Sequence, residues 1–224
     1  MSEFQPIILS LELAAITTAA LFFIAVPVAY WLSENDFKLK PVFSALISMP
    51  LVLPPTVLGF YLLVAFSPNN FLGGAIENIF NVRLVFSFEG LIIASMIYSL
   101  PFMVNPVQAG FENLSPSLKE AAYTLGKSKF QTFMRVLLPN IKPSLLTGIV
   151  LSFAHTIGEF GIVLMIGGNI PGKTRVASLA IYDEVEALNY HNANVYALTL
   201  FIITFTILLI VHIFNRKYLK SGKL

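Results

Sequence analysis

The sequence contains no cysteine and few charged residues for its length. Without cysteine it can form neither a disulfide framework nor a thiolate metal site. Lysine, arginine, aspartate and glutamate make up 12% of the 224 residues, whereas a soluble domain usually carries about 25%. This is too little charge to cover a globular surface, and the mean hydropathy is +0.78. The composition therefore predicts a protein whose solvent is mostly lipid.

Several motifs with known chemistry are also absent. The chain lacks a G-x-x-x-x-G-K-[ST] phosphate loop, so we expect it to hold no cofactor and a partner to bind and hydrolyse ATP. It has no H-E-x-x-H motif and no paired Asp or Ser–Lys constellation in its apolar stretches, which argues against a metal site and an intramembrane enzyme. Secondary carriers often consist of two related halves, and no internal repeat is visible. No basic residue precedes Lys38, so we expect the first apolar stretch to stay in the mature protein rather than act as a signal peptide.

Five stretches are apolar and long enough to cross a bilayer, which takes about 20 residues of helix. We therefore expect an all-α integral membrane fold with a single transmembrane domain over 1–224. The fourth stretch is interrupted by Glu159, and we interpret it as one helix that carries a buried carboxylate. The predicted spans are 11–33, 42–66, 90–110, 143–166 and 195–214.

The basic residues are distributed unevenly between the two sides of these spans. Eleven of the fourteen fall on the side of the C-terminus and of the loop between spans three and four. The other three are Arg83, Lys173 and Arg175. Because positive loops stay in the cytoplasm, we expect a multi-pass protein of the cell membrane with its N-terminus outside and its C-terminus inside. The expected surroundings are lipid and protein partners, with no nucleic acid.

The loop over 115–139 has the signals of two short helices. Ser115 and Pro116 fit a helix start, and Gly126 is placed to end that helix. Ser128 can cap a second helix, which we expect Pro139 to stop. Such helices lie on lipid headgroups or dock on a protein, and periodicity alone leaves both alternatives open. The apolar faces consist of Leu118, Ala121, Ala122 and Leu125 on the first helix, and Phe130, Phe133, Met134 and Leu137 on the second.

This loop resembles the E-A-A loop of the permease subunits of bacterial ABC importers. That loop reads E-A-A, three residues, G, nine residues, I, one residue, L-P, and the only departure here is Val136 for isoleucine. The resemblance implies the type I importer transmembrane fold, with coupling helices that sit in a groove of a cytoplasmic ATPase subunit. The residues that it assigns to ATPase coupling are Glu120, Ala121, Ala122, Leu125, Gly126, Leu138 and Pro139.

Two further stretches narrow the resemblance. "MPLVLPPTVLGF" (49–60) and "GEFGIVLMIGGNIPGKTR" (158–175) resemble the permeases of molybdate importers, with sulfate permeases next nearest. The resemblance implies a homodimer of this subunit, two ATPase subunits and an extracytoplasmic oxyanion-binding protein. Molybdate, tungstate and sulfate are all tetrahedral dianions, so sulfate, thiosulfate and tungstate stay open as the cargo. From another class, a membrane anchor that binds an ATPase but moves nothing also stays open.

Three residues inside the spans are candidates for the pathway or a gate: Thr56, His155 and Glu159. Ionisable residues inside membranes usually face a protein interior or a pathway. Because a carboxylate repels a dianion, we favour a structural or gate contact for Glu159 over a direct substrate contact. For His155 we favour a hydrogen bond between helices over a role as proton carrier. For Lys173 and Arg175 in the outer loop we favour solvated charges over contacts with an anion or with the binding protein.

Prolines and glycines mark places where the helices bend or pack closely. Three prolines, at 50, 54 and 55, interrupt the second span, and the freed backbone groups must face protein or water rather than lipid. The break is either a packing kink or a part of the translocation path that includes Thr56. Gly148, Gly158 and Gly161 are expected where two helices approach closely.

Overall fold

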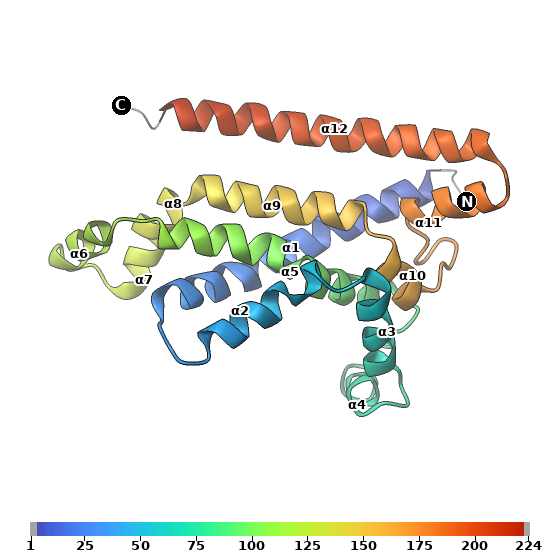
Figure 1. Cartoon of the computed structure of the whole chain (residues 1–224), viewed down its shortest axis with the longest axis horizontal. Helices are drawn as coiled ribbons and strands as arrows, with labels where there is room; N and C mark the ends of the chain where they lie inside the picture. The colour runs from blue at the N-terminus through green and yellow to red at the C-terminus, as the bar shows by residue number, and fades with distance from the viewer. Residues whose placement is uncertain (1–3, 222–224) are drawn as a thin grey trace.

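The computed structural model describes residues 4–221, apart from the side chains of residue 212 and of residues 214–221. Within this range every regular element is a helix, and the longest helices run along the long axis of the molecule (Figure 1). In chain order the elements are α1 (Gln5–Glu34), α2 (Lys40–Ser48), the 3₁₀ turn η1 (Met49–Leu51), α3 (Pro55–Phe66), α4 (Phe71–Phe80), α5 (Phe88–Glu112), α6 (Pro116–Thr124), α7 (Lys129–Thr132), the π-turn η2 (Phe133–Leu137), α8 (Leu138–Asn140), α9 (Lys142–Ile157), α10 (Gly161–Gly167), α11 (Ala177–Glu186) and α12 (Tyr190–Ser221).

Three of these helices are long and apolar enough to cross a membrane alone: α1, α5 and the part of α12 over Tyr190–Val211. Two bent pairs raise the number to five if each is one span. Helices α2–η1 and α3 meet at 109°, and the segment Lys129–Asn140 meets α9 at 73°. The long helices extend past the predicted apolar runs, since polar residues continue each helix at its ends. The predicted number of spans and their boundaries stay predictions.

The second and fourth predicted spans are both broken. Pro54 precedes α3 with an extended ψ of 134°, so α3 leaves the direction of α2. In the fourth span the single helix expected over 143–166 is wrong, because α9 ends at Ile157 and α10 begins at Gly161. Another helix, α11, stabilises the break, since the carbonyl oxygen of Glu159 accepts a hydrogen bond of 2.7 Å from Ser178 Oγ.

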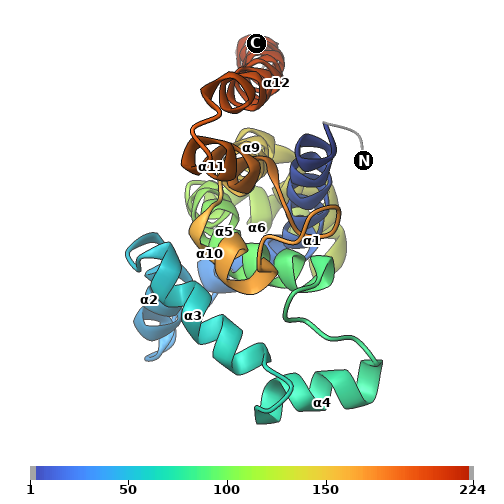
Figure 2. The ribbon, with the colours of Figure 1, turned by 90° about the vertical axis from the view of Figure 1, so that its right-hand side faces the viewer.

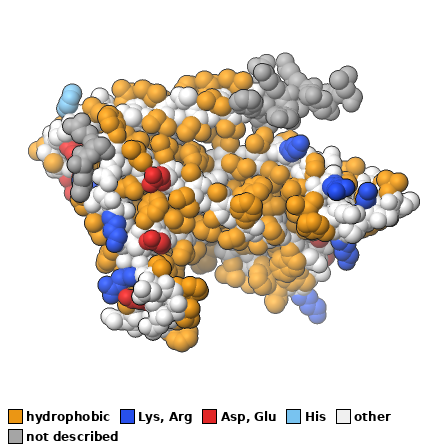
Figure 3. All heavy atoms as spheres, turned by 180° about the vertical axis from the view of Figure 1, so that it is seen from behind, with side chains coloured by type: hydrophobic (Ala, Val, Ile, Leu, Met, Phe, Trp, Pro, Cys, Tyr) orange, Lys and Arg blue, Asp and Glu red, His pale blue; other side chains and the backbone are white. Residues whose placement is uncertain are grey.

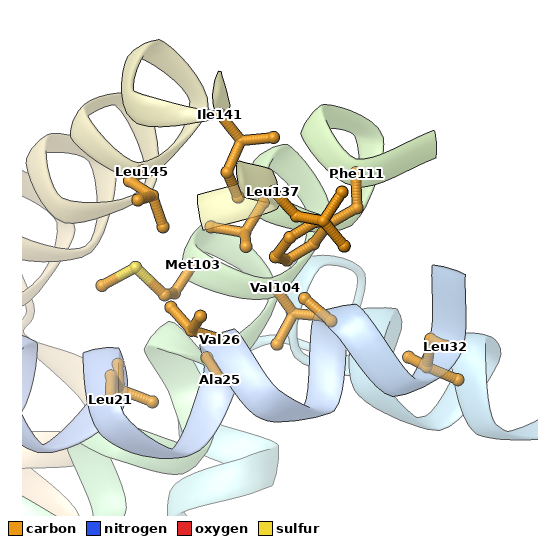
Figure 4. Packing of buried hydrophobic residues seen from close by; sticks show 12 residues of the cluster. Leu21, Ala25, Val26, Leu32, Met103, Val104, Phe111, Leu137, Ile141 and Leu145 are labelled. Atoms are coloured by element: carbon orange, nitrogen blue, oxygen red, sulfur yellow. The ribbon is translucent and has the colours of Figure 1, made fainter. Parts of the chain in front are cut away.

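Two apolar clusters form the core, one toward each end of the bundle. The cluster near the α6 end joins α1, α5, η2 and the start of α9, and Figure 4 shows its side chains pointing toward one another. The other cluster joins α5, α10 and the N-terminal part of α1. Along each of the helices α1, α5 and α9, buried polar residues occupy the stretch between the two clusters. They are Thr17, Thr18, Ser95, Ser99, Ser152 and Thr156.

Helices α2, α3 and α4 project to one side of the bundle, as the end-on view in Figure 2 shows. Apolar side chains cover most of the surface in Figure 3, and lysine and arginine side chains lie at the end that carries α6 and α7 and, in a smaller group, at the opposite end. Helix α12 presents an exposed apolar face, with Phe201 65% and Phe205 55% exposed. Exposed apolar surface of this extent fits contact with lipid or with another subunit.

Candidate functional site

The candidate coupling segment, residues 115–139, follows α5 and begins with α6. Pro116 occupies the first helical position as predicted. The Ser115 hydroxyl does not cap a backbone N–H, and instead shares a hydrogen bond of 2.7 Å with the hydroxyl of Ser117. The start of α6 is therefore set by the proline and by backbone geometry rather than by the predicted side-chain cap.

A rigid joint connects α6 to α7 at Gly126. This glycine has a φ of +73°, in the left-handed region, and its N–H bonds to the carbonyl of Tyr123 at 2.9 Å. The next N–H, of Lys127, reaches back to the carbonyl of Ala122 at 3.1 Å. These two bonds form a Schellman motif, which satisfies the last carbonyls of a helix. The predicted glycine ending of the first helix is confirmed.

The second helix starts with a complete capping box. Ser128 Oγ accepts a hydrogen bond of 3.2 Å from the N–H of Gln131, while Gln131 Oε1 accepts one of 3.3 Å from the N–H of Ser128. The predicted cap at Ser128 is confirmed. Only one residue, Lys127, separates this box from the glycine of the Schellman motif, so the connection between the two helices is fixed rather than loose.

The predicted stop at Pro139 is wrong by position. The helix passes through the π-turn η2 and ends only at Asn140, so Pro139 lies inside the last turn. Proline has no N–H to donate to the carbonyl four residues earlier. One residue before the proline, the N–H of Leu138 bonds to the carbonyl of Phe133, five residues earlier, which is the hydrogen-bond pattern of a π-turn. Leu138 itself is half-buried.

The residues that the coupling segment exposes are not all those predicted to form its apolar faces. Ala122 is only 4% exposed, because that side of α6 packs against η2. Leu125 is 77% exposed and Phe130 is 72% exposed, while Glu120, Ala121 and Pro139 are exposed as well. Tyr123 and Met134 also contribute exposed apolar surface. Helical spacing placed Phe130 and Met134 on one apolar face, but no sequence signal distinguished the outward from the inward side.

Contacts with α1 and α5 anchor this segment to the bundle. Lys119 on α6 forms an ion pair with Glu34 at the end of α1. An aromatic group joins three elements, with the ring of Tyr30 lying 5.1 Å from Phe111 and 4.7 Å from Phe133. The segment therefore contacts α1 directly and continues into α9. A displacement of the segment would act on both of these helices.

A second candidate site is a cavity of about 470 Å³ that brings together all three predicted pathway or gate residues. Thr56 comes from the start of α3, His155 from the last turn of α9, and Glu159 from the break before α10. Residues of three separate segments meet here because the break before α3 and the break between α9 and α10 both lie at this cavity. The cavity is also lined by Pro55, Tyr98, Ala154, Gly158, Phe160 and Gly161.

Close backbone packing brings α3 and α10 together beside this cavity. A Cβ on Gly161 would lie 2.8 Å from Cβ of Pro55, and a Cβ on Gly59 would lie 2.9 Å from Cβ of Met165. Gly148 is similarly close to Met103. The predicted close packing is confirmed for Gly148 and Gly161 and is wrong for Gly158, whose nearest atoms belong to its own helix turn. Gly158 is instead the residue after which α9 ends.

Glu159 is 4% exposed, and neither of its carboxylate oxygens has a hydrogen-bond partner among the described residues. The hydroxyl of Ser95 on α5 lies near the carboxylate, but without a hydrogen bond of ordinary geometry. A buried carboxylate with no partner is energetically unfavourable unless it is neutralised or the surroundings change.

His155 is hydrogen-bonded to a neighbouring helix, as predicted. Its Nδ1 lies 3.0 Å from Ser99 Oγ on α5. The imidazole ring stacks on Phe102 at 4.0 Å and lies 4.5 Å from the ring of Tyr98. Three residues of α5 thus hold the ring in one orientation at the wall of the cavity.

The loop between α10 and α11 is braced rather than free. Arg175 forms an ion pair of 2.5 Å with Asp183, and Asn169 donates to the same carboxylate at 2.9 Å. The predicted solvated charge at Arg175 is therefore wrong, since Asp183 on α11 holds it in place. Lys173 is exposed, as predicted. Ser10 on α1 accepts the N–H of Ala177 at 2.8 Å, which ties the end of this loop to the bundle.

The arrangement is that of the transmembrane subunit of an ABC importer. A crystal structure of a bacterial ABC transporter involved in the import of the acidic polysaccharide alginate superimposes with a TM-score of 0.80, covering 97% of this chain and 80% of that one at 17% identity. Both chains share the type I importer fold. The chain belongs to the family of binding-protein-dependent transport system inner membrane components, whose model matches residues 22–220.

Three relatives are similar over most of their length. The molybdenum transport system permease protein of Azotobacter vinelandii is 43% identical over 96% of this chain and 94% of its own. A putative molybdenum transport system permease protein of Bacillus subtilis is 36% identical over 93% of this chain and 92% of its own. A probable sulfate transport system permease protein of Chlorella vulgaris is 36% identical over 82% of this chain and 69% of its own.

Proposed function

We propose that this chain is the permease subunit of an ATP-driven importer of molybdate. The observation that carries the proposal is the 43% identity to a molybdenum permease over 96% of the chain. The similarity to a sulfate permease covers less of both chains. The cavity fits this role, since it offers a hydroxyl at Thr56 and an imidazole at His155 to a polar cargo.

The coupling segment supports a cytoplasmic ATPase subunit as partner. Its exposed apolar side chains, Leu125 and Phe130, extend from a joint that is fixed by backbone hydrogen bonds. A fixed joint transmits displacement as rigid-body motion instead of absorbing it. In this proposal the partner hydrolyses ATP, this chain has no ATPase or other enzymatic activity, and the segment moves α1, α5 and α9. The proposed orientation places the segment and the C-terminus in the cytoplasm and the N-terminus outside.

A second copy of the chain is the proposed partner of the α2–α3 side. Val52 is 85% exposed and Tyr61 is 63% exposed, on elements that project from the bundle beside the cavity. Pairing two copies through this side would bury apolar surface and close the cavity from lipid. An extracytoplasmic oxyanion-binding protein would then deliver the cargo at the outer end, where the loop over 168–176 is braced.

Uptake in reconstituted vesicles tests the proposal. Proteoliposomes that contain this subunit, its ATPase and its binding protein should accumulate labelled molybdate only when ATP is supplied to the ATPase side. Vesicles with an ATPase that binds but does not hydrolyse ATP are the control. Competition by tungstate but not by sulfate supports molybdate, whereas competition by sulfate transfers the assignment to sulfate. An assembled complex that moves no oxyanion contradicts the proposed cargo and favours the membrane-anchor alternative.

A further inference from the structure

The hydrogen bonds around His155 determine which of its nitrogens carries a hydrogen. Thr156 Oγ1 lies 2.9 Å from the carbonyl oxygen of Ser152, which can only accept, so the single hydroxyl hydrogen of Thr156 is used there. The contact of 3.0 Å between Ser99 Oγ and Thr156 Oγ1 therefore requires Ser99 as the donor. Both hydroxyl hydrogens are then assigned.

The assignment extends from Ser99 to the imidazole. Since the hydrogen of Ser99 points to Thr156, Ser99 Oγ can only accept from Nδ1 of His155 at 3.0 Å. Nδ1 carries a hydrogen in this arrangement, and the neutral ring has its lone pair on Nε2. Nε2 has no hydrogen-bond partner among the described residues and is not one of their buried unpaired atoms, so it is open to the cavity.

A lone pair at Nε2 has a direct consequence for an anionic cargo. An oxyanion offers only acceptor oxygens, and two acceptors cannot form a hydrogen bond without a proton between them. Once Nε2 binds a proton, the imidazolium offers both an N–H donor and a positive charge. Tetrahedral oxyanions form their stronger hydrogen bonds with charged donors of this kind.

Other groups at the cavity define where an anion would bind. Helices α1, α5 and α12 pack against α9, and of the described residues on these three helices only Tyr98 on α5 is a titratable group that lines the cavity. The break before α10 brings Glu159, whose carboxyl group repels an anion when it is ionised. Helix α3 brings Thr56 and its N-terminal end, which carries partial positive charge. We therefore expect the anion between His155 and Thr56, away from Glu159.

We propose that His155 is a membrane contact for the oxyanion cargo and that the contact forms only with one proton between Nε2 and an anion oxygen. The proton comes from water, stays on Nε2 while the anion is bound, and returns to water when the anion leaves. No covalent bond to the anion forms. Ser99 is a positioning residue, since it fixes the hydrogen on Nδ1 and so excludes the neutral donor tautomer. This inference rests on the proposed function, because it requires an oxyanion as cargo.

The test is the pH dependence of uptake in proteoliposomes with ATPase and binding protein present. Labelled molybdate uptake is divided by the ATP hydrolysed in the same vesicles, so that the pH dependence of the ATPase cancels. From about pH 8 to about pH 6.5 we expect the ratio for the unchanged protein to rise by up to about tenfold per pH unit. That slope is the limit for one proton.

Two variants separate the roles of charge and tautomer. H155R carries a permanent positive charge, so its ratio should be nearly independent of pH. S99A frees Nδ1, and the neutral ring can then place its hydrogen on Nε2, so the rise should become much shallower. S152A removes another fully buried hydroxyl from α9 while leaving the Ser152 carbonyl in place, and it should retain the full rise.

The outcomes distinguish this inference from the proposed function. A wild-type rise that H155R and S99A both retain would overturn the role of His155, and so would a flat wild-type profile. If H155R fails to assemble, co-purification of the ATPase will reveal it. In that case the difference in pH dependence between S99A and S152A still tests the role of His155. Absence of oxyanion uptake by the assembled wild-type complex at every pH would instead count against the proposed function.

Discussion

Gly126 shows how one backbone angle sets the geometry of the coupling segment. Its φ of +73° lies in a region that side chains with a Cβ avoid. A Cβ at this position would meet no atom within 4 Å, so space does not explain the glycine. Conformation alone does, since the two Schellman bonds and the capping box that follows both depend on this turn. Four other residues with a Cβ also have a positive φ: Asn81 and Asn169, as well as Phe86 and Leu188.

We predict that G126V uncouples ATP hydrolysis from uptake. A β-branched residue in the left-handed region should destabilise the joint by at least about 1 kcal/mol, so the angle between α6 and α7 should change while α5 and α9 stay intact. The measurement is uptake per ATP hydrolysed in proteoliposomes. G126N is the matched control, because asparagine tolerates this region, and it should keep most of the coupling. Equal coupling in both variants and the parent would show that the joint is not needed.

At the scale of elements, local signals in the sequence predicted the joint at Gly126 and Ser128 and the proline break in the second span, but not the break at Glu159. Gly126 and Ser128 act through neighbours within a few residues, so the end of α6 and the start of α7 could be predicted. The break at Glu159 depends on Ser178 Oγ, which belongs to α11 and reaches the site only in the folded chain. The side of α6 that faces inward, with Ala122 on it, depends in the same way on packing against η2.

The candidate cavity likewise depends on contacts that form only in the folded chain. Its three predicted residues were singled out one at a time, Thr56 from the prolines around it and His155 and Glu159 as polar residues in apolar surroundings. That they line one cavity follows from the packing of α10 against α3, and spacing along the sequence does not encode such contacts. The hydrogen bond of His155 was predicted, but its partner Ser99 is 56 residues away and could not be identified.

The exposed face of α6 gives a prediction at this scale. L125D should abolish co-purification of the ATPase subunit, because it places a charge on a side chain that is 77% exposed and contributes to the proposed docking surface. The variant should insert into the membrane and retain the thermal stability of the parent. L125M, which keeps an apolar side chain of similar volume, is the control. Normal co-purification of L125D would mean that the docking surface lies elsewhere.

At the scale of the whole molecule, the two apolar clusters and the buried polar residues between them divide the bundle along its length. The cluster near α6 connects the coupling segment to α1 and α5 through Leu137 and Ile141. The cluster near α10 surrounds the N-terminal part of α5. Because the polar stretch separates them, we expect each apolar cluster to move as one body and relative displacement to occur between them, at the level of the cavity.

The absence of cysteine provides a direct test of orientation. Single cysteines at Asn69, in the loop before α4, and at Ser117, on α6, both occupy exposed positions. In intact cells a membrane-impermeant maleimide should label N69C at once, and S117C only after the membrane is made permeable. The unchanged, cysteine-free protein is the control for background. The reverse pattern would invert the proposed topology and would place the coupling segment outside the cell.

The broken helices also determine how the chain can enter a membrane. Helix α9 has 16 residues, about 24 Å at 1.5 Å per residue, and falls short of a hydrocarbon layer of about 30 Å. Helix α3, with 12 residues, is shorter still. During synthesis α3 emerges before α5 and α10, the helices against which it packs. Biogenesis should therefore be stepwise: α1, α5 and α12 insert by themselves, whereas the short segments stay at the insertion machinery until their partners arrive.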